Sequence, residues 1–117
     1  MKISGIQELL DAKIFCCEEN LGKHVYSAFA SDMMSDVLAI VKDQAVLITG
    51  LINPQVVRTA EMMDMVCIVF TRGKVPSEHM IDLAKDSGIV LLSTVKTQYE
   101  TSGILYANNL KGGAENV

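Results

Sequence analysis

Polar side chains with ligand-binding chemistry follow four apolar segments of the chain, each at the point where the apolar run ends. They are Ser31, Asp32 and Ser35, then Thr49, Gly50 and Asn53, then Thr71, Arg72 and Gly73, and finally Thr94. Hydroxyls, free amides at helix starts and a guanidinium are groups that bind anionic oxygens. We therefore predict that these ten residues bind a small anionic ligand if the four places meet. The alternative is that they are ordinary helix caps and turns.

Catalytic motifs are missing from the sequence. It contains no G-x-x-x-x-G-K-[ST] phosphate loop, no G-x-G-x-x-G dinucleotide turn and no G-x-S-x-G nucleophile elbow. His24 and His79 have no cysteine or carboxylate at catalytic spacing, so we expect both at the surface. Asp32 and Asp36 are spaced i, i+4 and could hold a hard cation, but capping and favourable interaction with the helix dipole are the expected roles. We predict no catalytic activity, no cofactor and no metal site.

The cysteines and the hydropathy pattern bear on the compartment. Cys16, Cys17 and Cys67 are an odd number without disulfide spacing, which argues against a secreted disulfide scaffold. We expect reduced, buried thiols; a redox or metal role for Cys16 and Cys17 beside His24 is the alternative, disfavoured because no C-x-x-C pair is present. There is no signal-peptide pattern, and the longest apolar runs are far shorter than the ~20 residues of a membrane helix. We predict a cytoplasmic protein that does not enter membranes.

Strands and helices that could position the polar residues alternate along the chain. Apolar runs predict strands over residues 13–17, 24–30, 45–49, 66–70 and 89–92. Helix starts are predicted where capping residues occur: Ser4 with Gln7, Asp32 or Ser35, Asn53 with Pro54, Ser77, and Thr97 with Glu100. Gly88 suits the left-handed residue that ends a helix.

The later strands are apolar throughout rather than alternating, which is typical of parallel strands covered on both faces. We therefore predict an α/β fold, a three-layer single domain with a mostly parallel sheet of about five strands and helices on both faces. Residues 1–110 should form this domain and residues 111–117 a flexible tail. The order of the first two strands stays open, and they could form an antiparallel pair. Ligands of such sheets bind beyond the carboxyl ends of the strands, where the ten polar residues lie.

The composition excludes some partners and favours one. The 117 residues carry a net charge of −4 and only six aromatic side chains, so we expect no nucleic-acid binding. Half of the residues are hydrophobic, and seven are methionines. Because this exceeds what one small core needs, we expect a homodimer.

Four segments in order resemble the DRTGG-domain family. Residues 31–38 resemble its S-D-x-x-S-D-V-[LM] segment, and residues 47–55 resemble the strand, turn and helix that follow. Residues 72–78 resemble its glycine turn and P-x-E helix start, and residues 102–106 its G-x-L-Y pattern. The resemblance covers about residues 3–110. The chain has Leu51-Ile52 where related domains carry Asp-Arg, and Arg72-Gly73-Lys74 where they carry Thr-Gly-Gly.

The resemblance implies a non-catalytic regulatory or sensor module that occurs alone or joined to CBS domains and metabolic enzymes. Related folds include the N-terminal domain of the kinase/phosphorylase of the phosphocarrier protein HPr and a regulatory region of some phosphotransacetylases. We therefore expect a small anionic ligand, or a metabolic enzyme or kinase as partner. The alternatives are a protein–protein adaptor without ligand and, least favoured, a small enzyme that uses Asp32, Arg72 or Lys74.

Overall fold

The computed structural model describes residues 1–41 and 44–112; the predicted tail beyond residue 112 lies outside this range. In chain order the elements are α1 (Ile3–Leu10), β1 (Lys13–Cys16), the 3-10 turn η1 (Glu18–Asn20), β2 (Ser27–Ala30), α2 (Met34–Ile40), β3 (Ala45–Thr49), α3 (Pro54–Met62), β4 (Cys67–Phe70), α4 (Glu78–Ser87), β5 (Val90–Ser93) and α5 (Gln98–Ala107).

The strands form one five-stranded sheet in the order β1-β5-β4-β3-β2. Strands β2 to β5 are parallel, and each pairs with its neighbour in sequence. β1 closes the far edge antiparallel to β5, with Lys13 opposite Ser93. The first two strands therefore do not pair with each other but lie at opposite edges. The predicted α/β class with a mostly parallel five-stranded sheet is confirmed.

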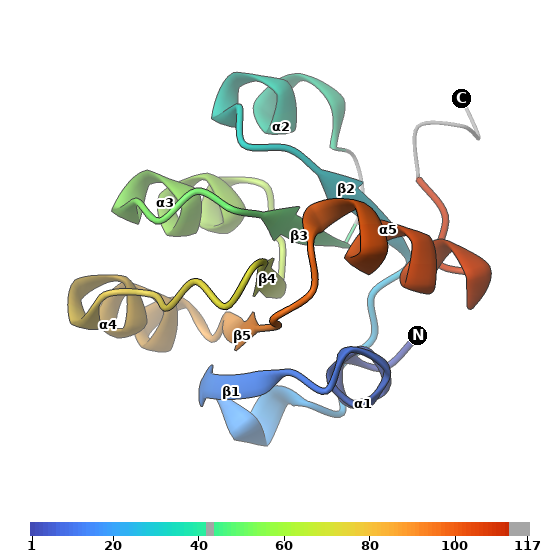
Figure 1. Cartoon of the computed structure of the whole chain (residues 1–117). Helices are drawn as coiled ribbons and strands as arrows, with labels where there is room; N and C mark the ends of the chain where they lie inside the picture. Colours follow the sequence, from blue (N-terminus) through green and yellow to red (C-terminus); the bar gives the residue numbers. More distant parts are fainter. Residues whose placement is uncertain (42–43, 113–117) are drawn as a thin grey trace.

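Helices cover both faces of this sheet (Figure 1). α2, α3 and α4 lie on one face, where α3 contacts both of its neighbours, and α1 and α5 pack together on the other face. The crossovers between β2, β3, β4 and β5 all run over the first face (Figure 1). β3, β4 and β5 are buried along their whole length, which explains their continuous apolar sequences.

Several predicted helix ends are confirmed. Asn53 caps α3 by accepting a hydrogen bond from the Gln55 amide, with Pro54 as the first helical residue. Thr97 and Glu100 form the predicted capping box of α5. Gly88 ends α4 in the left-handed conformation.

The predicted caps of α1 and α2 are wrong. α1 begins at Ile3, before Ser4, because the amides of Ile3 and Ser4 already donate to the carbonyls of Lys23 and Leu21. The side chain of Gln7 instead donates to the carbonyl of Ala12, beyond the other end of the helix.

α2 begins at Met34 without a side-chain cap. Asp32 precedes the helix, so it does not share a helix face with Asp36. Its carboxylate instead accepts a hydrogen bond from the Thr49 hydroxyl at the end of β3.

β2 is shorter than the predicted strand because the chain before it pairs with the N-terminus. Val25 donates its amide to the Met1 carbonyl, and His24 forms a single bridge with Lys2. On the outer edge of β2, the Ala28 amide donates to the carbonyl of Lys111. The segment after α5 therefore covers part of this sheet edge.

Candidate functional site

The carboxyl ends of the parallel strands lie together at one edge of the sheet, which we call the carboxyl edge. The register places Ala30 beside Ile48 and Thr49 beside Phe70, so β2, β3 and β4 end nearly level. The residues that follow these strands are polar. This register therefore brings the first three predicted loops into contact.

Asp32 joins the first loop to the second. One oxygen of its carboxylate, Oδ1, accepts hydrogen bonds from the Thr49 hydroxyl and from the Gly50 amide, each 2.8 Å long. Thr49 Oγ1 in turn accepts from the Leu51 amide at 3.2 Å. The carboxylate of Asp32 thus occupies two donors that were predicted to bind a ligand.

Gly50 forms the floor of a small polar space between three side chains. A methyl group on its Cα would lie 3.4 Å from Arg72 Nη2, 3.5 Å from Thr71 Oγ1 and 3.8 Å from Asp32 Oδ1. These are ordinary contact distances, so the space has room for about one heavy atom. We call it the Gly50 niche, defined by Asp32, Gly50, Thr71 and Arg72.

The hydroxyl of Thr71 lacks a hydrogen-bond partner. Thr71 is 1% exposed, and no described residue donates to or accepts from its Oγ1. A buried hydroxyl without a partner is costly, so such groups usually have a role. Here the hydroxyl borders the niche, where it could donate a hydrogen bond to a ligand oxygen.

Arg72 is held at the niche by its backbone. It adopts a left-handed conformation with φ 57°, which is uncommon for a residue other than glycine. Its amide donates to the Lys96 carbonyl, and the amide of Gly73 donates to the Thr94 carbonyl. The loops after β4 and β5 are therefore joined, while Arg72 as a residue stays exposed.

The other predicted site residues have structural partners or lie apart from the niche. Ser31 exchanges hydrogen bonds with the backbone of Met33, and Asn53 caps α3. Thr94 donates its hydroxyl to the Leu10 carbonyl, at the end of α1. Ser35 is exposed in the first turn of α2. Of the ten residues, Asp32, Thr49, Gly50, Thr71 and Arg72 are brought together.

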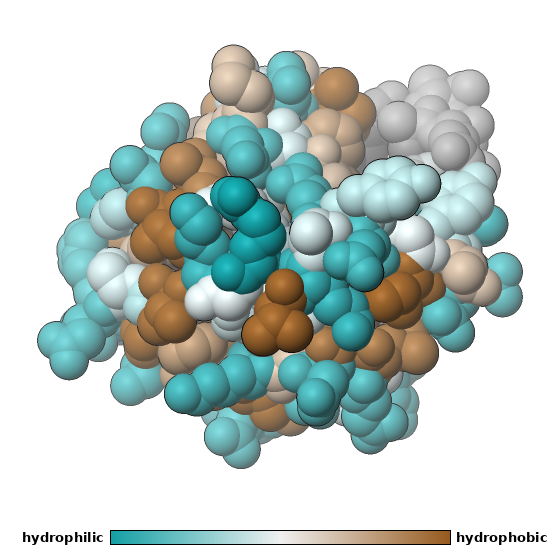
Figure 2. Space-filling model, viewed as in Figure 1, coloured by the Kyte–Doolittle hydropathy of each residue, from teal (hydrophilic) through white to brown (hydrophobic). Residues whose placement is uncertain are grey.

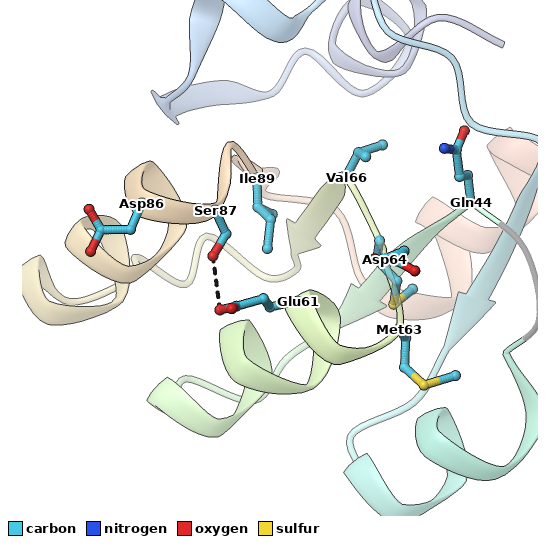
Figure 3. A pocket seen from close by; sticks show the side chains of 9 residues that line it. Gln44, Glu61, Met63, Asp64, Val66, Asp86, Ser87 and Ile89 are labelled. Carbon is cyan, nitrogen blue, oxygen red and sulfur yellow. Dashed lines mark hydrogen bonds between the residues drawn. The ribbon is translucent and has the colours of Figure 1, made fainter.

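A second hollow lies at the opposite edge of the sheet and was missed by the sequence analysis. This open depression of about 580 Å³ is lined by residues that include Glu61, Asp64 and Asp86. Figure 3 shows Glu61 and Ser87 turned toward each other; the Ser87 hydroxyl donates to Glu61 at 2.9 Å. The acidic residues near the ends of α3 and α4 were the available signal. Within residues 1–41 and 44–112, no three potential ligands are placed to hold a metal ion.

The three thiols are free and buried, as predicted. Cys16 donates to the Ile89 carbonyl at 3.4 Å, and Cys17 to the Ala84 carbonyl at 3.8 Å. Burial raises the pKa of Cys17 to about 12, and the neighbouring Cys16 adds to this rise. Burial also raises the pKa of Cys67. Because the thiolate is the reactive form, these thiols are poor nucleophiles.

The surface shows no single continuous apolar area on the face seen in Figure 2, where brown apolar patches alternate with teal hydrophilic side chains. Over the described part of the chain, none of the helices has the length and apolar character needed to span a bilayer. The cytoplasmic location stays a prediction.

Comparison with solved structures gives the regulatory region of a Clostridium perfringens pyrophosphatase, consisting of CBS and DRTGG domains in complex with the activator diadenosine tetraphosphate. It matches with a TM-score of 0.71 and 19% sequence identity over 89% of this chain. The match covers 45% of that chain, so this protein corresponds to less than half of it. Comparison with the curated proteins gave no match. The model of the DRTGG domain matches residues 5–107, and the chain belongs to this family.

Proposed function

We propose that this DRTGG domain is a non-catalytic regulatory module that binds a small anionic ligand at the Gly50 niche. The single observation that supports the site most directly is the Thr71 hydroxyl, which is buried, has no partner among the described residues and borders the niche. A ligand oxygen there would accept from Thr71 and from the guanidinium of Arg72.

The charges around the niche favour one anionic group rather than several. Arg72 contributes a positive charge, and the carboxylate of Asp32 offsets part of it at the same place. The other edge of the sheet carries Glu61, Asp64 and Asp86, so an anion is repelled there. The best ligand therefore presents a single phosphate or carboxylate group to Arg72 and leaves its remaining groups over the exposed loops.

The comparisons support the regulatory part of this proposal. DRTGG domains are regulatory, and the pyrophosphatase region was solved with a nucleotide activator. Because the pyrophosphatase region is only 19% identical to this chain, its likeness supports the fold, and the regulatory role is inferred from membership of the family. Support for the place of binding comes only from the niche of this chain.

Catalysis is not part of the proposal. Thr71 has no base within hydrogen-bond reach among the described residues, so nothing activates its hydroxyl as a nucleophile. The histidines, His24 and His79, are both exposed, and neither is one of the four residues that define the niche. An adaptor that binds a metabolic enzyme or kinase without any ligand remains the alternative function.

Isothermal titration with four probes tests the ligand: inorganic phosphate, a nucleoside monophosphate, diadenosine tetraphosphate and a dicarboxylate. Gly50→Ala should weaken binding of the active probe by about tenfold or more, because its methyl group fills the niche and displaces a charge-assisted hydrogen bond. Arg72→Gln should do the same by removing the charge.

Two matched variants serve as controls. Gly22→Ala adds a methyl group where no described atom lies within 4 Å, and Arg58→Gln removes the other arginine, which is exposed on α3. Both should bind like the unaltered protein. If a probe binds and Gly50→Ala leaves its affinity unchanged, the niche is not the site. If no probe binds while a partner protein is captured equally by all variants, the adaptor function is correct.

A further inference from the structure

The outer face of α5 carries an exposed stripe that nothing in the described chain covers. Tyr99 is 88% exposed and Tyr106 51% exposed, one near each end of the helix. Between and beside them lie the small residues Ser102, Gly103 and Ala107, and together the five residues line an open hollow of about 340 Å³. We call these five residues the α5 stripe. Figure 2 shows pale side chains of intermediate hydropathy over this helix.

No neighbour among the described residues explains why position 103 is a glycine. A methyl group on its Cα would meet no described atom within 4 Å, so no neighbour requires a glycine here. Glycine in a helix interior is less favourable than alanine. The opposite side of the helix packs against the sheet, where Thr101 and Leu105 are buried. Gly103 therefore leaves room for another backbone on the outside of the helix.

We propose that a second copy of this chain packs on the α5 stripe, with the two α5 helices antiparallel about a twofold axis near Gly103. The stripe is self-complementary in this arrangement because its bulky residues lie at the ends and its small residues in the middle. Tyr99 then faces Tyr106 of the partner subunit, and the small residues let the two helices approach closely. Aromatic pairs of this kind stabilise an interface beyond the burial of their surface.

The charges at the two ends of the stripe select a second copy in this orientation. Lys111 Nζ lies 3.6 Å from the centroid of the Tyr106 ring, which places a positive charge at the carboxyl end of the stripe. Glu100 lies beside Tyr99 at the other end, and its Oε1 accepts from Thr97, which fixes its position. The antiparallel arrangement brings Glu100 near Lys111 of the partner subunit at both ends. A parallel arrangement would place like charges together.

Sedimentation of the 117-residue chain over a concentration series tests this proposal. The unaltered protein should dimerise, and Gly103→Gln should raise the dimer dissociation constant by about tenfold or more, because the added side chain separates the helices. The same change at Gly22, a position equally free of neighbours, should leave the constant unchanged. Tyr99→Ser, at a residue that is almost fully exposed, gives a second variant that does not depend on how the helix tolerates a glutamine in place of Gly103.

A charge exchange tests the orientation. Lys111→Glu should weaken the dimer, and adding Glu100→Lys to the same chain should restore it toward the original dissociation constant. A protein that stays monomeric at every concentration overturns the proposal, as does a dimer that none of the stripe variants weakens. Neither outcome affects the Gly50 niche, because that site is built from other elements of a single chain.

Discussion

Replacing Thr71 by valine tests two expected properties of its hydroxyl: it lowers the stability of the free protein, and it donates a hydrogen bond to the ligand. Valine has nearly the shape of threonine but no hydroxyl, so it removes the buried Oγ1 that lacks a partner and leaves the packing intact. Thr101 provides a matched control. It is 0% exposed, its hydroxyl also lacks a partner among the described residues, and it lies on the inner face of α5 rather than at the niche.

The expected magnitude follows from the desolvation of a hydroxyl. A buried hydroxyl that makes no hydrogen bond costs about 1–3 kcal/mol. Each valine substitution should therefore raise the free energy of unfolding by about 1 kcal/mol, because valine requires no partner. For a domain of this size, that corresponds to a rise in melting temperature of about 4 °C. Only Thr71→Val should also weaken binding of the anionic probe, by about tenfold.

Urea denaturation of the two single variants and the double variant, each with and without the probe, measures both quantities. If the two threonines act independently, their effects on stability should add. If Thr71→Val lowers the free energy of unfolding by about 1 kcal/mol while Thr101→Val raises it, the Thr71 hydroxyl has a partner in the free protein. The niche would then offer no unused donor, and the proposed ligand would lose its main support.

Three further predictions concern other parts of the fold. Asp32→Ala should lower the free energy of unfolding by about 1–2 kcal/mol, since the buried Gly50 amide loses its acceptor; an unchanged urea midpoint would contradict this. Thr97→Ala should cost about 1 kcal/mol in the same assay by opening the capping box of α5, whereas Ser4→Ala, at a cap that does not form, should cost almost nothing. Cys17 has a pKa of about 12 in the fold against an ordinary 9.0, so folding favours the protonated thiol. Its stabilisation should be complete below pH 9 and decline as the pH rises toward 12, with a smaller decline in Cys17→Ala, as measured by denaturation at a series of pH values.

Predictions from local patterns succeeded where the partners are close in sequence. Residues 45–49 form β3 with the expected bounds because the run is buried throughout and Gly50 follows it. The capping box of Thr97 and Glu100 needs only atoms within one helical turn. Ser4 shows the same local pattern, yet its cap does not form, because the carbonyls of Lys23 and Leu21 satisfy the first amides of α1.

Contacts between distant residues could not be predicted in this way. The sequence shows an acidic residue next to a helix start, which indicates a cap, and gives no sign that Thr49 and Gly50 hold Asp32 instead. The unpartnered state of the Thr71 hydroxyl depends on the surroundings of one atom. The place of β1 likewise depends on a pairing with β5 near the other end of the chain.

The strand order also has a consequence for how the chain folds. Ser27 pairs with Ala45, and each later parallel pair joins residues that are similarly far apart in the sequence. The pairing of β1 with β5 instead joins Lys13 to Ser93 and closes a much longer loop of chain. This last loop is about four times as long, so its closure costs roughly 1.2 kcal/mol more in chain entropy. The four parallel strands should therefore assemble first and β1 dock last. Native-state hydrogen exchange should accordingly show β1 opening at lower free energy than β3 and β4, as the least protected strand of an otherwise cooperative sheet.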